Sequence, residues 1–122
     1  MASERRQYPR IPTDLPLEVR TGDGEVVRVA ARNLSCGGLE MSCDRWCADR
    51  LLPPGHQAFP GQPIKVQLAF QLPAGEGSRG VAVAAEVVDS RRLSQNEYRV
   101  GLHFTTFEGD GEALVERFVH AR

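Results

Sequence analysis

Apolar and polar residues alternate along much of this chain, with the period of two that is typical of a half-buried β-strand. The alternating segments run over residues 15–20, 26–32, 39–44, 64–70, 81–87 and 98–105. Proline and glycine are frequent at 73–80, and this stretch predicts a hairpin between the fourth and fifth segments. We expect residues 91–96 to form a polar connection before the last strand.

The period changes near the C-terminus, where four apolar residues fall on one face of a helical projection: Leu114, Val115, Phe118 and Val119. This pattern predicts an amphipathic helix over about residues 110–120, with Asp110 as its N-cap. Six short strands and one helix favour an all-β fold, a six-stranded antiparallel β-barrel with a C-terminal α-helix. Closure into a barrel removes the edges that an open sheet would leave exposed.

Residues 45–62 follow neither period, and five prolines and glycines interrupt them: Pro53, Pro54, Gly55, Pro60 and Gly61. We expect a long loop here, with one or two helical turns over 45–52. Trp46 is the only tryptophan. We expect it to plug the barrel end beneath this loop rather than to stack on a ligand, because isolated large aromatic residues more often serve packing.

The length of 122 residues fits one domain, and we expect a flexible N-terminal arm over 1–13 and a single barrel domain over 14–122. The sequence has no apolar run of about 18 residues and no signal peptide, so it predicts a cytoplasmic protein without a membrane span. Three cysteines in such a chain predict reduced thiols. The net charge of −1 argues against nucleic acid as a partner, because non-specific binders need a basic field.

Two polar segments are candidates for chemistry. Arg5, Arg6 and Arg10 concentrate positive charge in the arm, and Pro9 favours an extended chain between them. Alone, such a cluster is typical of a solvated tail. The segment Asn33-Leu34-Ser35-Cys36-Gly37-Gly38 lies between two predicted strands. Short polar residues and glycine are typical of an ordinary turn, and they also allow a flat ligand to approach the backbone.

The combination of Arg-x-x-x-Arg before the first strand and Asn-x-Ser-x-x-Gly between the second and third resembles the PilZ domain family, which are receptors for cyclic diguanylate (c-di-GMP). The likeness extends over nearly the whole chain, including Tyr98-Arg99-Val100-Gly101-Leu102-His103-Phe104 and the terminal helix. It implies that c-di-GMP is the ligand and that the chain has no cofactor and no enzymatic activity. It also implies a set of ligand-binding residues: Arg5, Arg6, Arg10, Asn33, Ser35, Gly37 and Gly38.

The chemistry of the ligand fits these residue types. Guanine offers the acceptors O6 and N7 on one edge and the donors N1–H and N2–H₂ on another, so forked arginines suit the first edge and the phosphates. We expect Asn33 and Ser35 to meet the base or sugar, with Gly38 leaving room beside them. The position of Arg5 resembles that in relatives that bind an intercalated ligand dimer, which favours two ligands per site. Many relatives have Asp where this chain has Asn33, and a carboxylate accepts from both guanine donors. Asn33→Asp is therefore expected to keep or improve binding.

The resemblance implies that ligand binding orders the arm and signals to an unknown downstream protein through a conformational change. A homodimer through exposed strand edges, the terminal helix or the ligand itself is also open. Two other interpretations are a PilZ adaptor that works without ligand and a small barrel that binds single-stranded nucleic acid. The near-neutral charge and an aromatic content of 7% argue against the second.

Other motifs in the sequence are weaker evidence of function. Gly75-Glu76-Gly77-Ser78-Arg79-Gly80 matches the dinucleotide fingerprint, but a strand and not a helix is predicted to follow it, so we expect a hairpin loop. Cys36, Cys43 and Cys47 with His56 contain no close Cys-x-x-Cys pair, and no metal site is expected. We expect Cys43 to be a small core residue. No histidine has a recognisable nucleophile paired with it in the sequence, so a catalytic triad is not predicted.

Overall fold

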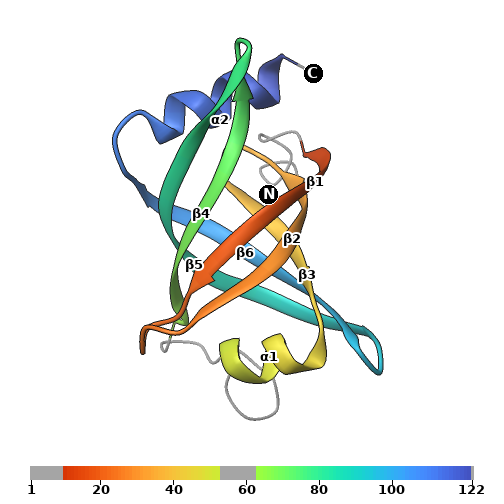
Figure 1. The fold of residues 1–122 in the computed structure, drawn as a ribbon. Coiled ribbons are helices and arrows are strands. Elements are labelled where there is room, and N and C mark those ends of the chain that lie inside the picture. Colours follow the sequence, from red (N-terminus) through yellow and green to blue (C-terminus); the bar gives the residue numbers. More distant parts are fainter. Residues whose placement is uncertain (1–9, 53–62, 122) are drawn as a thin grey trace, which may run out of the picture.

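The computed structural model describes residues 10–52 and 63–121. In this part of the chain the strands are β1 (Ile11–Arg20), β2 (Val26–Leu34), β3 (Gly38–Cys43), β4 (Lys65–Ala74), β5 (Gly77–Ser94) and β6 (Glu97–Phe107), and the helices are α1 (Arg45–Leu51) and α2 (Gly111–His120). The strands pair antiparallel in the order β1-β2-β3-β6-β5-β4 and close into a barrel (Figure 1). The predicted six-stranded antiparallel barrel with a C-terminal helix is confirmed.

The alternating pattern places one face of each strand in the core. Along β4, Val66, Leu68, Phe70 and Leu72 are buried while the residues between them are exposed. The buried cluster continues into both helices, which lie at opposite ends of the barrel (Figure 1). Each helix therefore covers one end of the apolar interior.

Two strands extend beyond their predicted bounds. β1 begins at Ile11, so residues 11–13, predicted as part of the arm, belong to the barrel. β5 continues to Ser94, and the connection predicted over 91–96 is in fact a tight turn between paired strands. This end of β5 is exposed on both faces, so it shows no alternation in the sequence. The flexibility of the arm stays a prediction, because residues 1–9 lie outside the described residues.

α1 confirms the helical turns predicted after residue 44, and Asp44 caps the helix by accepting a hydrogen bond from the backbone N–H of Cys47 at 2.9 Å. The prediction that Trp46 plugs the barrel is wrong. The residues that α1 buries are Cys47, Ala48 and Leu51, so Trp46 lies on the outer side with 54% of its surface exposed. The guanidinium carbon of Arg50 lies 3.8 Å from the centre of the indole ring. The rest of the predicted loop, 53–62, lies outside the described residues.

α2 begins where the sequence predicts, and its buried residues include Leu114, Val115 and Val119. Asp110 occupies the N-cap position, but its side chain makes no capping hydrogen bond. The carboxylate of Asp110 instead forms an ion pair with Arg79, which lies near the turn of the β4–β5 hairpin. The hairpin itself is confirmed, since β4 and β5 pair from Lys65–Glu86 to Ala74–Gly77. No described helix is both long and apolar enough to cross a membrane.

Candidate functional site

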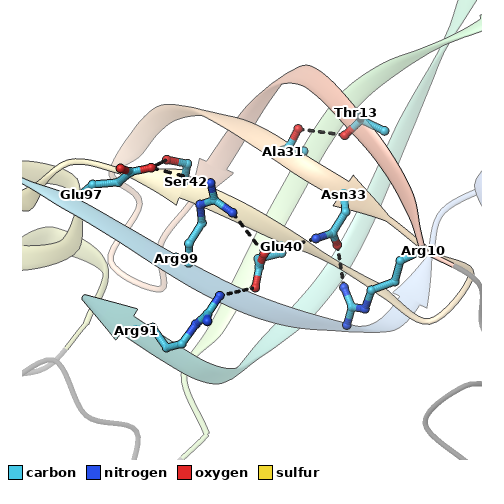
Figure 2. Close-up of polar contacts among 9 residues, drawn as sticks. All are labelled: Arg10, Thr13, Ala31, Asn33, Glu40, Ser42, Arg91, Glu97 and Arg99. Atoms are coloured by element: carbon cyan, nitrogen blue, oxygen red, sulfur yellow. Dashed lines mark hydrogen bonds and ion pairs between the residues drawn. The ribbon is translucent and has the colours of Figure 1, made fainter. Parts of the chain in front are cut away.

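Polar side chains from four strands meet on one outer surface of the barrel, next to the first described residue of the chain. Figure 2 shows them pointing toward one another. Arg10 immediately precedes β1 in the sequence, and the others lie on strands: Asn33 on β2, Glu40 on β3, Arg99 on β6 and Arg91 on β5. We call these five residues the polar face. This set contains three guanidinium groups and one carboxylate, and two further carboxylates lie beside it, those of Glu97 and Asp89.

Asn33 joins the arm to the barrel. Its carbonyl oxygen Oδ1 accepts a hydrogen bond from Nη1 of Arg10 at 2.6 Å, and its Nδ2 donates to Oε1 of Glu40 at 3.2 Å. Asn33 and Glu40 are direct cross-strand partners between β2 and β3. The last arginine of the first motif and the first residue of the second are thus in contact, as their common role in the sequence prediction requires.

Glu40 holds the two barrel arginines. Arg91 and Arg99 are cross-strand partners, and like charges directly opposite each other are destabilising. Oε1 of Glu40 lies 3.4 Å from Nη1 of Arg99, and its Oε2 lies 3.6 Å from Nη2 of Arg91. The carboxylate therefore offsets the repulsion between both guanidinium groups. Its own side chain is only 21% exposed, so these contacts are less screened than those of a fully exposed ion pair.

Arg99 retains hydrogen-bonding capacity. A second contact joins its Nη2 to Glu97 at 3.7 Å, but its Nε is buried and has no hydrogen-bond partner among the described residues. A buried donor without an acceptor costs free energy. Within the polar face the three arginines offer only donors to a ligand, and Glu40 offers only acceptors.

The turn between β2 and β3 is built around Ser35. This residue is 4% exposed, and its Oγ donates to the carbonyl of Gly38 at 3.1 Å while accepting from the backbone N–H groups of Gly37 and Gly38. The hydroxyl is therefore used inside the turn and shapes the backbone beside Asn33. Direct contact of Ser35 with a base or sugar stays a prediction.

Gly38 has a task within the barrel itself. A Cβ at this position would lie 2.1 Å from the carbonyl oxygen of Leu102, so the missing side chain makes room for β6. The carbonyl of Gly37 accepts from the N–H of Phe104 at 2.9 Å. Both glycines thus fasten the turn to β6. Their role as ligand contacts is untested, and Arg5 and Arg6 lie outside the described residues.

The thiols point to structure and not to reactivity. Cys43 and Cys47 are buried, and burial raises the pKa of Cys43 to about 12 and that of Cys47 to about 11. Burial and the neighbouring Glu116 and Glu112 also raise the pKa of Cys36. Cys43 is a core residue, as predicted. Among the described residues no group of His, Cys, Asp and Glu is arranged to hold a metal ion.

A separate apolar cleft of about 520 Å³ opens between β1 and β4, where Leu17, Phe70 and Val81 form part of its wall. The two strands pair only from Glu18–Ala69 to Arg20–Gln67, and the cleft forms beyond that point. It shares no residue with the polar face. We assign the candidate site to the polar face because the charged groups meet there, together with Arg10 of the first motif and Asn33 of the second.

Sequence reasoning missed Glu40, Arg91 and Arg99. Glu40 has the polar phase of its strand, two residues after the second motif, so its outward direction was predictable. The partners of Glu40 were not predictable, because the alternating pattern of a single strand does not determine the register between β3, β6 and β5.

Comparison with known proteins identifies the class that this fold and site define. The family model described as PilZ domain matches residues 4–121, and the chain belongs to that family. No curated protein matches the sequence.

Solved structures of low sequence identity share the fold. The inhibitor of motility MotI/DgrA of Bacillus subtilis superimposes with a TM-score of 0.67 at 23% identity, covering 96% of this chain and 51% of that protein. The chain thus spans about half of MotI/DgrA. The PilZ domain of CeSA from a cellulose-synthesizing bacterium gives 0.57 at 24% identity, with 93% and 96% covered. The PilZ domain of YcgR from Escherichia coli, solved with c-di-GMP, gives 0.63 at 16% identity, with 96% and 90% covered.

Proposed function

We propose that this chain is a receptor for c-di-GMP and that the ligand binds between the arm and the polar face. The contact between Arg10 and Asn33 carries the proposal, because it joins the last residue of the Arg-x-x-x-Arg motif to the first residue of the Asn-x-Ser-x-x-Gly motif across 23 residues of sequence. Membership of the PilZ family and the c-di-GMP complex of the YcgR domain support the choice of ligand.

The chemistry of binding follows from the donors and acceptors. The ligand presents anionic phosphates and the O6 and N7 acceptors of guanine to Arg6 and Arg10, and it presents N1–H and N2–H₂ to the carbonyl oxygen of Asn33. In the free chain Arg10 and Asn33 satisfy each other. The ligand replaces this single bond with several charge-assisted ones, with Arg5 available to a second ligand molecule in an intercalated pair.

Binding is the whole of the activity that we assign, without catalysis. Contacts from the arm that exist only with ligand present give the two states that a signal requires, and the altered surface is offered to a downstream protein. The role assigns the chain to the cytoplasm, which fits three cysteines without a disulfide.

Isothermal titration calorimetry with c-di-GMP tests the proposal, and we expect saturable binding with two ligand molecules per chain. Arg10→Ala removes a charge-assisted bond and should weaken binding at least about tenfold, or about 1.5 kcal/mol. Arg28→Ala is the matched control, because Arg28 is an exposed arginine of β2 that pairs with Glu18 and lies outside the polar face. It should bind as the unaltered chain does.

Absence of binding by the unaltered chain would refute the receptor and favour an adaptor that works without ligand. Equal losses in both arginine variants would mean that general charge, or the cleft that Arg28 also lines, attracts the ligand in place of the polar face. Limited proteolysis supplies a second check, since the ligand should protect the first ten residues from cleavage.

A further inference from the structure

Asn33 stands between a pure donor and a pure acceptor. Arg10 offers only N–H groups on one side, and the carboxylate of Glu40 offers only oxygens on the other. If the amide were rotated by half a turn, N–H would face N–H and oxygen would face oxygen. The two neighbours therefore fix a single orientation, in which Oδ1 points to Arg10 and the arm.

Glu40 is held in place from its other side. Arg91 of β5 and Arg99 of β6 contact its two oxygens, and its position opposite Asn33 is set by the pairing of β2 with β3. On the β1 side, the residue opposite Asn33 is the uncharged Pro12. The charged side chains that contact the pair are Arg10, Arg91 and Arg99, and Glu40 is the only described acid that contacts the amide of Asn33. Asp89 of β5 lies one strand further away, over Gly101, the β6 residue opposite Glu40.

From this geometry we propose that Glu40 is a positioning residue that orients the Asn33 amide toward the ligand and makes asparagine, not aspartate, the fitting residue at position 33. The proposal rests on the proposed function and concerns the same site. A carboxylate at position 33 keeps the acceptor toward Arg10 but places a second oxygen against Glu40, where the amide has a donor at 3.2 Å. Like charges at directly opposite positions of paired strands are unfavourable.

This inference reverses the expectation from sequence alone, in which Asn33→Asp keeps or improves binding. That expectation considered only the ligand side of the residue. The barrel side contains Glu40, which changes the sign of the expected effect. Exchanging donor and acceptor in both residues should restore the fit, because a glutamine at position 40 donates to a carboxylate at position 33.

The test is a double-mutant cycle with Asn33→Asp, Glu40→Gln and the combined variant, read out as c-di-GMP affinity near pH 7.5. We expect Asn33→Asp to weaken binding about fivefold and the combined variant to bind within about twofold of Glu40→Gln, since contacting residues couple by this order. Asn96→Asp is the charge-matched control, because Asn96 uses its carbonyl oxygen to accept from the N–H of Arg45, at the opposite end of β3. It should leave affinity unchanged.

A second readout needs no ligand. In the free chain, nuclear magnetic resonance measures the pKa of the carboxyl introduced by Asn33→Asp, and its spectrum reports whether the variant is folded. That pKa should fall by about 1 pH unit when Glu40→Gln removes the neighbouring negative charge. A Glu40 carboxylate that does not face position 33 would not move it.

An Asn33→Asp variant that binds as tightly as the unaltered chain, or an introduced carboxyl with the same pKa in both backgrounds, overturns the proposal. Failure of the unaltered chain to bind c-di-GMP overturns the proposed function instead. The pKa comparison then decides by itself whether Glu40 selects the residue at position 33.

Discussion

At the scale of single residues, Gly38 shows how the binding motif depends on the barrel. The carbonyl oxygen of Leu102 occupies the space where a side chain would begin, 2.1 Å from an ideal Cβ. Gly38→Ala must therefore push β3 away from β6 and should lower the free energy of unfolding by about 2 kcal/mol, within the range for overpacking. Urea unfolding followed by circular dichroism measures this change.

Gly22→Ala is the matched control for that substitution. Gly22 lies in the turn between β1 and β2, and a Cβ there meets no atom within 4 Å. This variant should stay within about 0.5 kcal/mol of the unaltered chain. Equal stability of the Gly38 and Gly22 variants would show that the approach of β6 does not require glycine.

The two motifs could be recognised in the sequence, but the contacts that their residues make were only partly predictable. Asn33 contacts Arg10, as the joint role of the two motifs suggests. Ser35 reads in the sequence as a ligand contact, yet its hydroxyl closes the turn. The difference arises because a short polar residue in a turn has backbone groups within reach as well as solvent. Sequence alone does not rank these partners.

At the scale of elements, alternation located all six strands because each strand has one buried face. It failed at residues 91–94 of β5, where both faces meet solvent and pairing with β6 alone maintains the strand. It also misplaced Trp46. The phase of a helix as short as α1 is set by its cap at Asp44 and by the few residues it buries, and an aromatic side chain does not decide it.

The two helix starts show the same limit. Asp44 and Asp110 both precede a helix, and aspartate is a favoured N-cap residue. Asp44 caps α1, whereas Asp110 forms an ion pair with Arg79 of the β4–β5 hairpin. A tertiary ion pair that sequence spacing does not reveal competes with the local bond.

At the scale of the whole molecule, the buried thiols link stability to pH. The pKa values of Cys43 and Cys47 are raised to about 12 and about 11 in the folded chain, from an ordinary value of 9.0. Unfolding therefore releases protons once the pH exceeds about 9, so the stabilisation is complete below that pH and is lost as the pH rises toward 11 and 12. The free energy of unfolding should fall between pH 8.5 and 10.5 in urea titrations.

A comparison variant isolates the thiols from other groups that titrate in this range. Replacing both residues, as Cys43→Ala with Cys47→Ala, lowers stability at every pH but should flatten its decline above pH 9. A decline as steep as that of the unaltered chain would show that other groups cause it.

The barrel was predictable because its closure follows from strand number and pattern, whereas the polar face depends on register. Glu40 meets Asn33, Arg91 and Arg99 only because β2, β3, β6 and β5 pair as they do. A shift of one position would turn each side chain to the other face of its strand. The site is thus a property of the closed sheet, and the motifs mark only part of it.

The central claim is that c-di-GMP binds on the polar face, and mapping the ligand by nuclear magnetic resonance on the isotope-labelled chain tests it most directly. We expect the largest shifts on titration at Arg10, at Asn33 to Gly38 and at Glu40, with small changes along the apolar cleft between β1 and β4. Shifts concentrated in that cleft, or a spectrum unchanged at saturating ligand, would contradict it.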